Sequence, residues 1–282
     1  MSAIRSLAGV TIVVPDLDAA IVAYRDWLGY VAGPITTVGD ALACRWGADA
    51  ASMARMVALT PKSGEDRFVR LVEGQADPDY RPLASLGWIA AEIIVQDVDA
   101  LAERLGVKEC PFEIIGAPAV LDFDFTDQIK AMQVVGPGGE VLYLTEVGEP
   151  IPGFDLPVAN SFVGQLFIMV LAADDIATTA ARYASPTHPL GAIFDARVAI
   201  ISAAYGLPAD HRHRLATVAF EEASLIEIDA APPAARLRGR SSIGLPSGIA
   251  LVSFVANDAG APDTRQSGAV DEWYELCSGN NK

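Results

Sequence analysis

Histidine and glutamate residues give this sequence its most direct hint of a metal site. The histidines are His188, His211 and His213. If His211-x-His213 begins a strand, both rings point to one face, because side chains alternate along a strand. Glu227, on the next expected strand, would then complete a two-histidine, one-carboxylate set suited to iron or manganese. The alternative interpretation is a solvated strand start that follows the turn at residues 208–210.

Other common catalytic arrangements are absent from the sequence. It contains no Ser-His-Asp pattern, no Cys-His pair and no glycine-rich nucleotide loop. The segment Gly136-Pro-Gly-Gly139 precedes a strand-like run, so it predicts a hairpin turn and not a phosphate loop. Cys44, Cys110 and Cys277 are far apart without a CxxC motif, which indicates reduced thiols in a cytoplasmic protein.

Length, composition and charge limit the class of protein. The 282 residues suit two packed domains, since 51% are hydrophobic and 20% are charged. A net charge of −16 would repel a phosphate backbone, so we expect no nucleic-acid partner. No apolar run reaches the roughly 20 residues that span a bilayer, and Met1–Leu7 does not resemble a secretory signal. We therefore expect no membrane segment and a cytoplasmic location.

An internal repeat determines the expected architecture. Residues Thr11–Ala19 and Glu92–Ala100 both read as an apolar strand, then Asp-x-Asp-Ala, then a helix. Asp16 and Asp97 are expected N-caps, and the helices are expected to end at Gly29 and Gly106. Further strands and a hairpin follow each helix, which predicts a βαβββ module twice.

A third module is expected from Val163 to Asp229, and a fourth begins at Gly248 but is truncated. The predicted class is α+β, with tandem modules forming curved mixed sheets. The predicted division is a first domain at 1–147, with modules at about 1–80 and 81–147, a linker at 148–161 and a second domain at 162–282.

These motifs resemble the vicinal-oxygen-chelate superfamily of glyoxalases, bleomycin-resistance proteins and extradiol dioxygenases. The resemblance rests on Val14-Pro-Asp16-Leu-Asp18-Ala19 with Tyr24 and Leu28-Gly29, on its echo at 95–106, and on the hairpin 136–144. That hairpin is similar to the family's Asp-Pro-x-Gly-x-x-x-Glu-Leu signature, with Gly136 in place of Asp. The resemblance is good over 6–147 and moderate over 162–230, and it implies paired modules that form open cups around small molecules.

The resemblance also implies where metal ligands would lie, on the first and last strands of a module. In the first two modules these positions hold Gly9, Ala90, Arg70 and Tyr143. Glycine and alanine offer no ligand, tyrosine is an uncommon ligand, and arginine repels a divalent cation. We therefore expect a metal-free first cup and no cofactor, with iron, manganese or zinc at His211, His213 and Glu227 as the alternative. Glu227 occupies the last-strand position of the third module, without an evident partner.

The first cup is expected to hold acid–base groups instead. Alternation along the strands places Arg70, Glu92 and Tyr143 on one inner face. Arg70 would bind a carboxylate or an enolate, Glu92 would act as a general base, and Tyr143 would donate to an oxyanion. The alternative is an ion pair between Arg70 and Glu92. The predicted substrate-lining residues are Thr11, Trp88, Gln133 and Tyr205, and the acidic segment 122–127 is expected to cover this cup.

Three functions remain open from the sequence. The first is a metal-independent lyase or isomerase acting on a small carbonyl or aromatic acid-like substrate, and the second is a sequestering protein of the resistance type. The third is an extradiol-type dioxygenase, which Leu251 at the aligned fourth-module position and a missing last strand oppose. We expect a homodimer, with the strand 248–255 completing the third module's sheet and segment 271–277 crossing the dimer interface.

Overall fold

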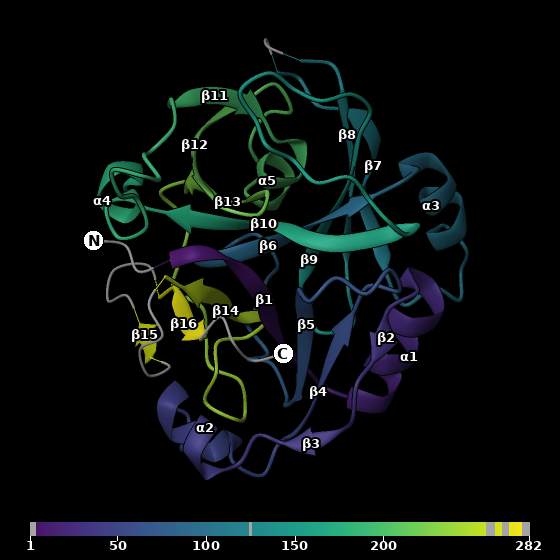
Figure 1. Ribbon diagram of the computed structural model, residues 1–282, viewed down its shortest axis with the longest axis vertical. Helices are drawn as coiled ribbons and strands as arrows, with labels where there is room; N and C mark the ends of the chain where they lie inside the picture. Colours follow the sequence, from purple (N-terminus) through teal and green to yellow (C-terminus); the bar gives the residue numbers. More distant parts are fainter. Residues whose placement is uncertain (1–3, 124–125, 258–262, 267–270, 278–282) are drawn as a thin grey trace.

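The described strands form two large sheets (Figure 1). The structure, a computed structural model, describes residues 4–123, 126–257, 263–266 and 271–277. The first sheet has the order β15-β16-β14-β1-β5-β4-β2, with β3 beside β4. Its strands are β1 (Ile4–Val14), β2 (Val31–Ala32), β3 (Thr36–Thr37), β4 (Arg55–Thr60), β5 (Phe68–Glu73), β14 (Ile249–Ala256), β15 (Asp263–Gln266) and β16 (Trp273–Cys277).

The second sheet has the order β11-β12-β13-β10-β6-β9-β8-β7. Its strands are β6 (Gly87–Val95), β7 (Glu113–Val120), β8 (Ile129–Val135), β9 (Val141–Val147), β10 (Val163–Ala173), β11 (Phe194–Arg197), β12 (Arg212–Phe220) and β13 (Ser224–Ala230). The helices are α1 (Leu17–Leu28), α2 (Asp40–Trp46), η1 (Asp49–Ala51), α3 (Val98–Leu105), α4 (Ile176–Ala180) and α5 (Ala199–Ala204).

The local signals in the sequence are confirmed. Asp16 and Asp97 cap α1 and α3 by accepting from the backbone N–H three residues later. Gly29 ends α1 at a φ of 75°, a left-handed conformation that favours glycine. The hairpin of β8 and β9 pairs in register from Ile129 with Val147 to Val135 with Val141.

The pairing of the modules differs from the expectation. β1 of the first module pairs antiparallel with β14 of the fourth, so opposite ends of the chain lie side by side (Figure 1). β6 of the second module pairs with β10 of the third. The prediction that residues 1–147 form one cup is therefore wrong for the described strands, and so is the assignment of strand 248–255 to the third module's sheet. Each module offers a similar open edge, and its local sequence does not specify which edges join.

The shortened fourth module is present as expected, but it keeps a last strand. β16 runs parallel to β14 and pairs Ser253 with Glu275. Segment 271–277 thus lies within the first sheet, and its contact across a dimer interface stays a prediction.

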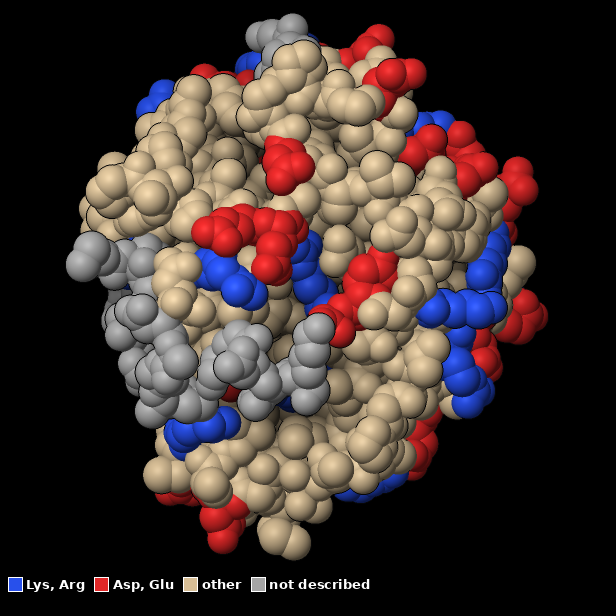
Figure 2. All heavy atoms as spheres, viewed as in Figure 1, with Lys and Arg blue, Asp and Glu red and all other residues tan. Residues whose placement is uncertain are grey.

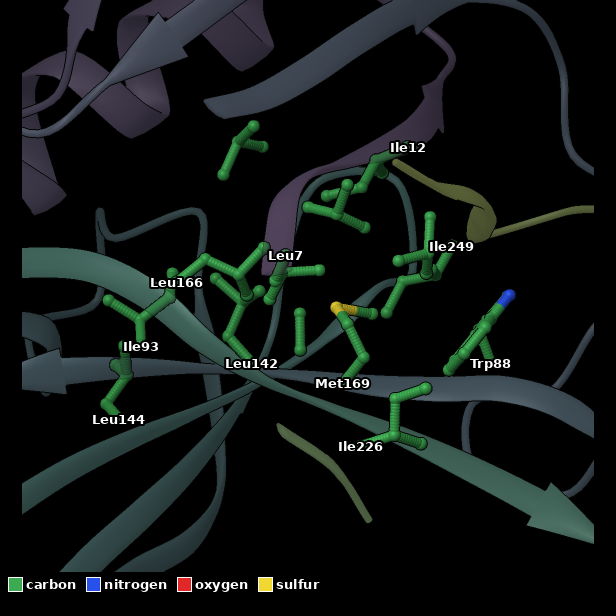
Figure 3. Close-up of a cluster of buried hydrophobic side chains, with 14 of the residues drawn as sticks. Leu7, Ile12, Trp88, Ile93, Leu142, Leu144, Leu166, Met169, Ile226 and Ile249 are labelled. Carbon is green, nitrogen blue, oxygen red and sulfur yellow. The ribbon is translucent and has the colours of Figure 1, made fainter. Parts of the chain in front are cut away.

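A shared hydrophobic core lies between the two sheets. Leu7 and Ile12 of β1 meet Leu142 of β9 and Met169 of β10, and Figure 3 shows these side chains converging from the two sheets. Trp88 is buried in this core, where its indole N–H donates to the carbonyl of Trp273. Because side chains alternate, neighbouring residues of the same strands point away from this core, to what we call the cup side of each sheet.

The surface carries charges of both signs. On the face in Figure 2, basic side chains are scattered among acidic ones and do not form a stripe. Among the described residues, no helix is long and apolar enough to cross a membrane.

Candidate functional site

Acidic groups gather on the cup side of the second sheet. The core-facing residues of β6, β9 and β13 include Ile93, Leu142 and Ile226. The intervening residues, which face the cup, include Glu92 on β6, Tyr143 on β9, and Glu227 and Asp229 on β13. Glu92 is paired in register with Tyr143, and Val170 of β10 with Glu227. Four neighbouring strands thus bring these side chains to one place.

Three neighbouring cavities lie on this side of the second sheet, and two of them border the acidic group. A cavity of about 480 Å³ is bordered by Glu92, Gln133, Tyr143 and Glu227, and by α5 on the opposite side. A smaller one of about 60 Å³ also borders Glu92 and Glu227. A third, of about 630 Å³, lies beside them and shares Phe123 with both. These cavities make the cup of the second sheet, formed by the second and third modules and called the second cup below, the candidate functional site, with room for a small molecule.

Glu92 has an environment suited to proton transfer. It is 6% exposed, and its carboxylate accepts a hydrogen bond of 2.5 Å from the Thr145 hydroxyl. Burial, followed by the nearby charge of Glu227, raises the pKa of Glu92 to about 8, although the Thr145 hydrogen bond opposes this rise. Glu92 can therefore exchange a proton near neutral pH.

Glu227 and Asp229 form a coupled pair on β13. Burial raises the pKa of Glu227 to about 7. Burial, and then the charge of Glu227, raises the pKa of Asp229 well above its ordinary value. Both carboxyl oxygens of Asp229 lack a donor among the described residues. A proton shared between the two carboxyls accounts for these observations.

The Tyr143 hydroxyl lies among these carboxyls without a hydrogen-bond partner in the described part of the chain. Burial, followed by the charges of Asp229, Glu227 and Glu92, raises its pKa well above the ordinary value. The hydroxyl therefore stays protonated and is available to donate to a bound ligand. A buried polar group of this kind costs free energy until it finds a partner.

These raised pKa values predict that the chain loses stability as pH rises from about 5 to 8. Glu92 and Glu227 bind protons in the folded chain over this range and release them on unfolding, so each contributes stability at low pH that is lost above its folded pKa. The expected slope is about 1.4 kcal/mol per pH unit for each proton difference. Urea unfolding across this range measures it.

Glu92→Gln should flatten that slope, and the exposed Glu221→Gln should leave it unchanged. Equal slopes in the wild type and in Glu92→Gln would show that Glu92 titrates normally.

The cup of the first sheet, formed by the first and fourth modules and called the first cup below, contains an ion pair between its own side chains. The Arg70 guanidinium donates to Glu275 Oε1 at 2.8 Å and to the Thr11 hydroxyl at 3.2 Å. Glu275 also accepts from Ser253 and from the indole of Trp46. Burial alone would raise the pKa of Glu275, but Arg70 and these donors hold it below its ordinary value. Arg70 therefore neutralises the carboxylate at a last-strand position, where the family resemblance places a metal ligand.

The packing around Gly9 and Ala90 accounts for the lack of a metal-ligand side chain at these two positions. A Cβ on Gly9 would lie 2.5 Å from the Phe68 ring. Ala90 is fully buried in the apolar lining of the second cup. A larger side chain therefore has no room at Gly9, and the neighbours of Ala90 are apolar.

The described donors do not fit a resident divalent metal. No three His, Cys, Asp or Glu side chains among them gather in an arrangement that could hold one. His213 is buried and hydrogen-bonded to Ser202 at 2.9 Å, and its ring packs on His211. Glu227 is paired with Thr217, four residues further along β12 than His213. The two-histidine, one-carboxylate site is therefore not formed.

The other predicted site residues lie in different parts of the fold and do not form one site. Arg70 and Thr11 lie in the first sheet, whereas Glu92, Tyr143 and Gln133 lie in the second, so the predicted convergence of Arg70 with Glu92 and their alternative ion pair are both wrong. Trp88 is in the shared core. Tyr205 packs beside the apolar lining of the second cup but does not border its cavities.

The acidic segment lies near the second cup. Asp122 and Phe123 border its cavities, whereas the prediction placed the segment over a cup formed by the first two modules. Residues 124–125 lie outside the described residues.

Several residues of the two cups were not predicted from the sequence. Asp229 could have been predicted, because it follows Glu227 by two residues on the same strand and therefore lies on the same face. Glu275 could also have been predicted, because Glu275-Leu276 repeats the family's Glu-Leu dipeptide. Phe154 and Phe220, which line the 630 Å³ cavity, could not have been predicted, because loops and distant strands bring them together.

The paired βαβββ modules and their cups define a vicinal-oxygen-chelate fold, as the resemblance predicted. Glyoxalase I from Zea mays superposes with a TM-score of 0.62 at 15% identity, over 97% of this chain and 92% of that one. A proposed dioxygenase from Bacillus subtilis superposes with a TM-score of 0.58 at 10% identity, over 99% and 87%. At these identities the likeness shows the fold alone. No family model and no curated protein matches the sequence.

Proposed function

We propose that the second cup catalyses acid–base chemistry on a small carbonyl compound, of the lyase or isomerase type and without a metal. The observation that carries the proposal is Glu92, a buried carboxyl with a pKa of about 8 on the wall of a 480 Å³ cavity. A pKa close to the working pH is what a general base requires. The described donors do not support the dioxygenase alternative.

The side chains divide the reaction between them. The Glu92 carboxylate takes a proton from the carbon next to the substrate carbonyl, and the C–H electron pair moves into the forming enolate. Tyr143, whose hydroxyl lacks a partner among the described residues, donates to the enolate oxygen. Glu92 then returns the proton to a different atom in an isomerisation, or the enolate expels a leaving group in a lyase reaction.

The test is exchange of carbon-bound hydrogen with solvent. The chain is incubated in D2O with small α-keto acids, hydroxyketones and β-dicarbonyl compounds, and loss of the C–H signal is followed by NMR. We expect enzyme-dependent exchange that rises with pH and levels off above about 8, because the base must be ionised. Ligands that bind without exchange would instead support a sequestering protein.

A further inference from the structure

We infer that the second cup accepts a substrate with a cationic group, an amine or guanidinium, on a small apolar or aromatic body. This inference names a substrate class for the proposed active site and rests on that site being the substrate site. Its geometric basis is the position of Glu92 and Glu227 on the wall of one cavity together with the unpartnered Tyr143 hydroxyl, with Asp229 beside Glu227 on the same face of β13.

The charges around the cavity favour a cation. Glu92 and Glu227 border both the 480 Å³ and the 60 Å³ cavities. Among the described residues that border the three cavities, the basic side chains are Arg197 and Arg212. Both approach Asp122, at 3.4 and 4.0 Å, and are themselves substantially exposed. The interior of the cup therefore contains carboxyls without a basic partner, which repel an anionic ligand when they are ionised.

The unsatisfied groups match the hydrogen-bonding pattern of a cation. Glu227 borders two of the cavities, and apart from the proton that it shares with Glu227, Asp229 has no donor among the described residues. An ammonium or guanidinium group offers several N–H donors and no acceptor. Bound at Glu227, such a group would displace the proton that Glu227 shares with Asp229 and would donate to the ionised Glu227 carboxylate.

Aromatic side chains extend the same site. Phe123, Phe154 and Phe194 border both the 60 Å³ and the 630 Å³ cavities, and Phe123 and Phe194 meet edge to face at 5.9 Å. Aromatic rings accept both apolar bodies and cations. The larger cavity can therefore hold the body of a substrate whose charged end reaches Glu227.

A bound cation would also change the protonation of the base. Glu92 faces Tyr143 and Thr145 on β9, Glu227 and Asp229 on β13, and Gln133 on β8, with Asp122 and Arg197 at the cavity edge. A cation placed among these groups favours the ionised form of Glu92. Substrate binding would thus generate the carboxylate that the proposed reaction needs.

The experiment compares three probes with the same body: benzylamine, benzyl alcohol and benzoate. Isothermal titration calorimetry is carried out at pH 6, 7 and 8 in buffers of different ionisation enthalpy. We expect benzylamine to bind at least tenfold more tightly than benzyl alcohol and benzoate, to bind more tightly as pH rises, and to release protons on binding. Benzoate binding as tightly as benzylamine, or no binding of benzylamine, would overturn the inference.

Variants locate the binding group. Glu227→Gln should weaken benzylamine at least tenfold, whereas the exposed Glu221→Gln should not change its affinity. Equal affinity in Glu227→Gln and wild type would place the amine elsewhere and reject this site. This outcome can be distinguished from that of the proposed function. Amine binding without hydrogen exchange in any carbonyl compound would support the cation site and reject the proposed catalysis. Hydrogen exchange without amine binding would support the catalysis and reject the cation site.

Discussion

Replacing Arg70 by methionine is expected to destabilise the folded chain by about 3–5 kcal/mol. The side chains of Arg70 and Glu275 are 16% and 5% exposed, and their charged atoms lie 2.8 Å apart. Without the guanidinium, Glu275 would remain buried beside Trp46 and Ser253 with no counter-charge. Chemical unfolding followed by circular dichroism measures the loss.

The double variant Arg70→Met, Glu275→Leu should recover most of this loss, because an apolar pair of similar volume leaves no buried charge. Arg55→Met is the matched control, since its partner Asp18 is 68% exposed and solvent screens such a pair. We expect the control to unfold close to the wild type. A small effect of Arg70→Met, comparable to that of the control, would show that the ion pair does not hold the first cup together.

The sequence predicts the modules well because their signals are local. A capping aspartate, the glycine that ends α1 and the Gly-rich hairpin each act within a few residues, and the structure contains all three. Alternation along β6 and β9 likewise predicts that Glu92 and Tyr143 share a face. These features depend on backbone geometry that neighbouring residues determine.

The pairing of modules depends on distant contacts and could not be predicted in the same way. β1 and β6 present similar apolar runs, and the sequence does not say which partner each accepts. The structure joins β1 to β14 and β6 to β10, so Arg70 meets Glu275, and Glu92 meets Glu227. One change of partner thus converts the expected arginine–glutamate site into an ion pair in one cup and an acidic cluster in the other.

Glu275 could nevertheless have been identified from the sequence. Leu71, Leu144, Ile228 and Leu276 each follow a last-strand residue that faces a cup, so the same two-residue pattern occurs in every module. The short distance from Asp258 to the end of the chain led to the prediction that this strand was missing. The structure shows that the fourth module is shortened before β16 and not after it.

Glu92→Gln is expected to reduce the hydrogen-exchange rate by about 10²- to 10⁴-fold, the usual contribution of a general base. The amide keeps the shape of the side chain but cannot take the proton. Tyr143→Phe should cost about 10²- to 10³-fold by removing the donor to the enolate oxygen. Both rates are measured by NMR in D2O on the carbonyl compound that the wild type exchanges fastest.

A matched control is Glu140→Gln. Glu140 is also a buried carboxyl, whose pKa burial raises to about 7, but it accepts from Tyr24 and does not border the three cavities. Its replacement should leave the exchange rate per folded molecule unchanged. A comparable rate loss in Glu140→Gln would indicate general damage to the fold and remove the support for Glu92 as the base.

The pH profile gives a further readout for Glu92 itself. The Thr145 hydroxyl stabilises the ionised form of Glu92 through its hydrogen bond, so Thr145→Val should move the midpoint of the rate profile to higher pH. A purely structural role for Thr145 would lower the rate at every pH and leave the midpoint in place. An unchanged midpoint would therefore show that the group controlling the rate is not the carboxyl that Thr145 contacts.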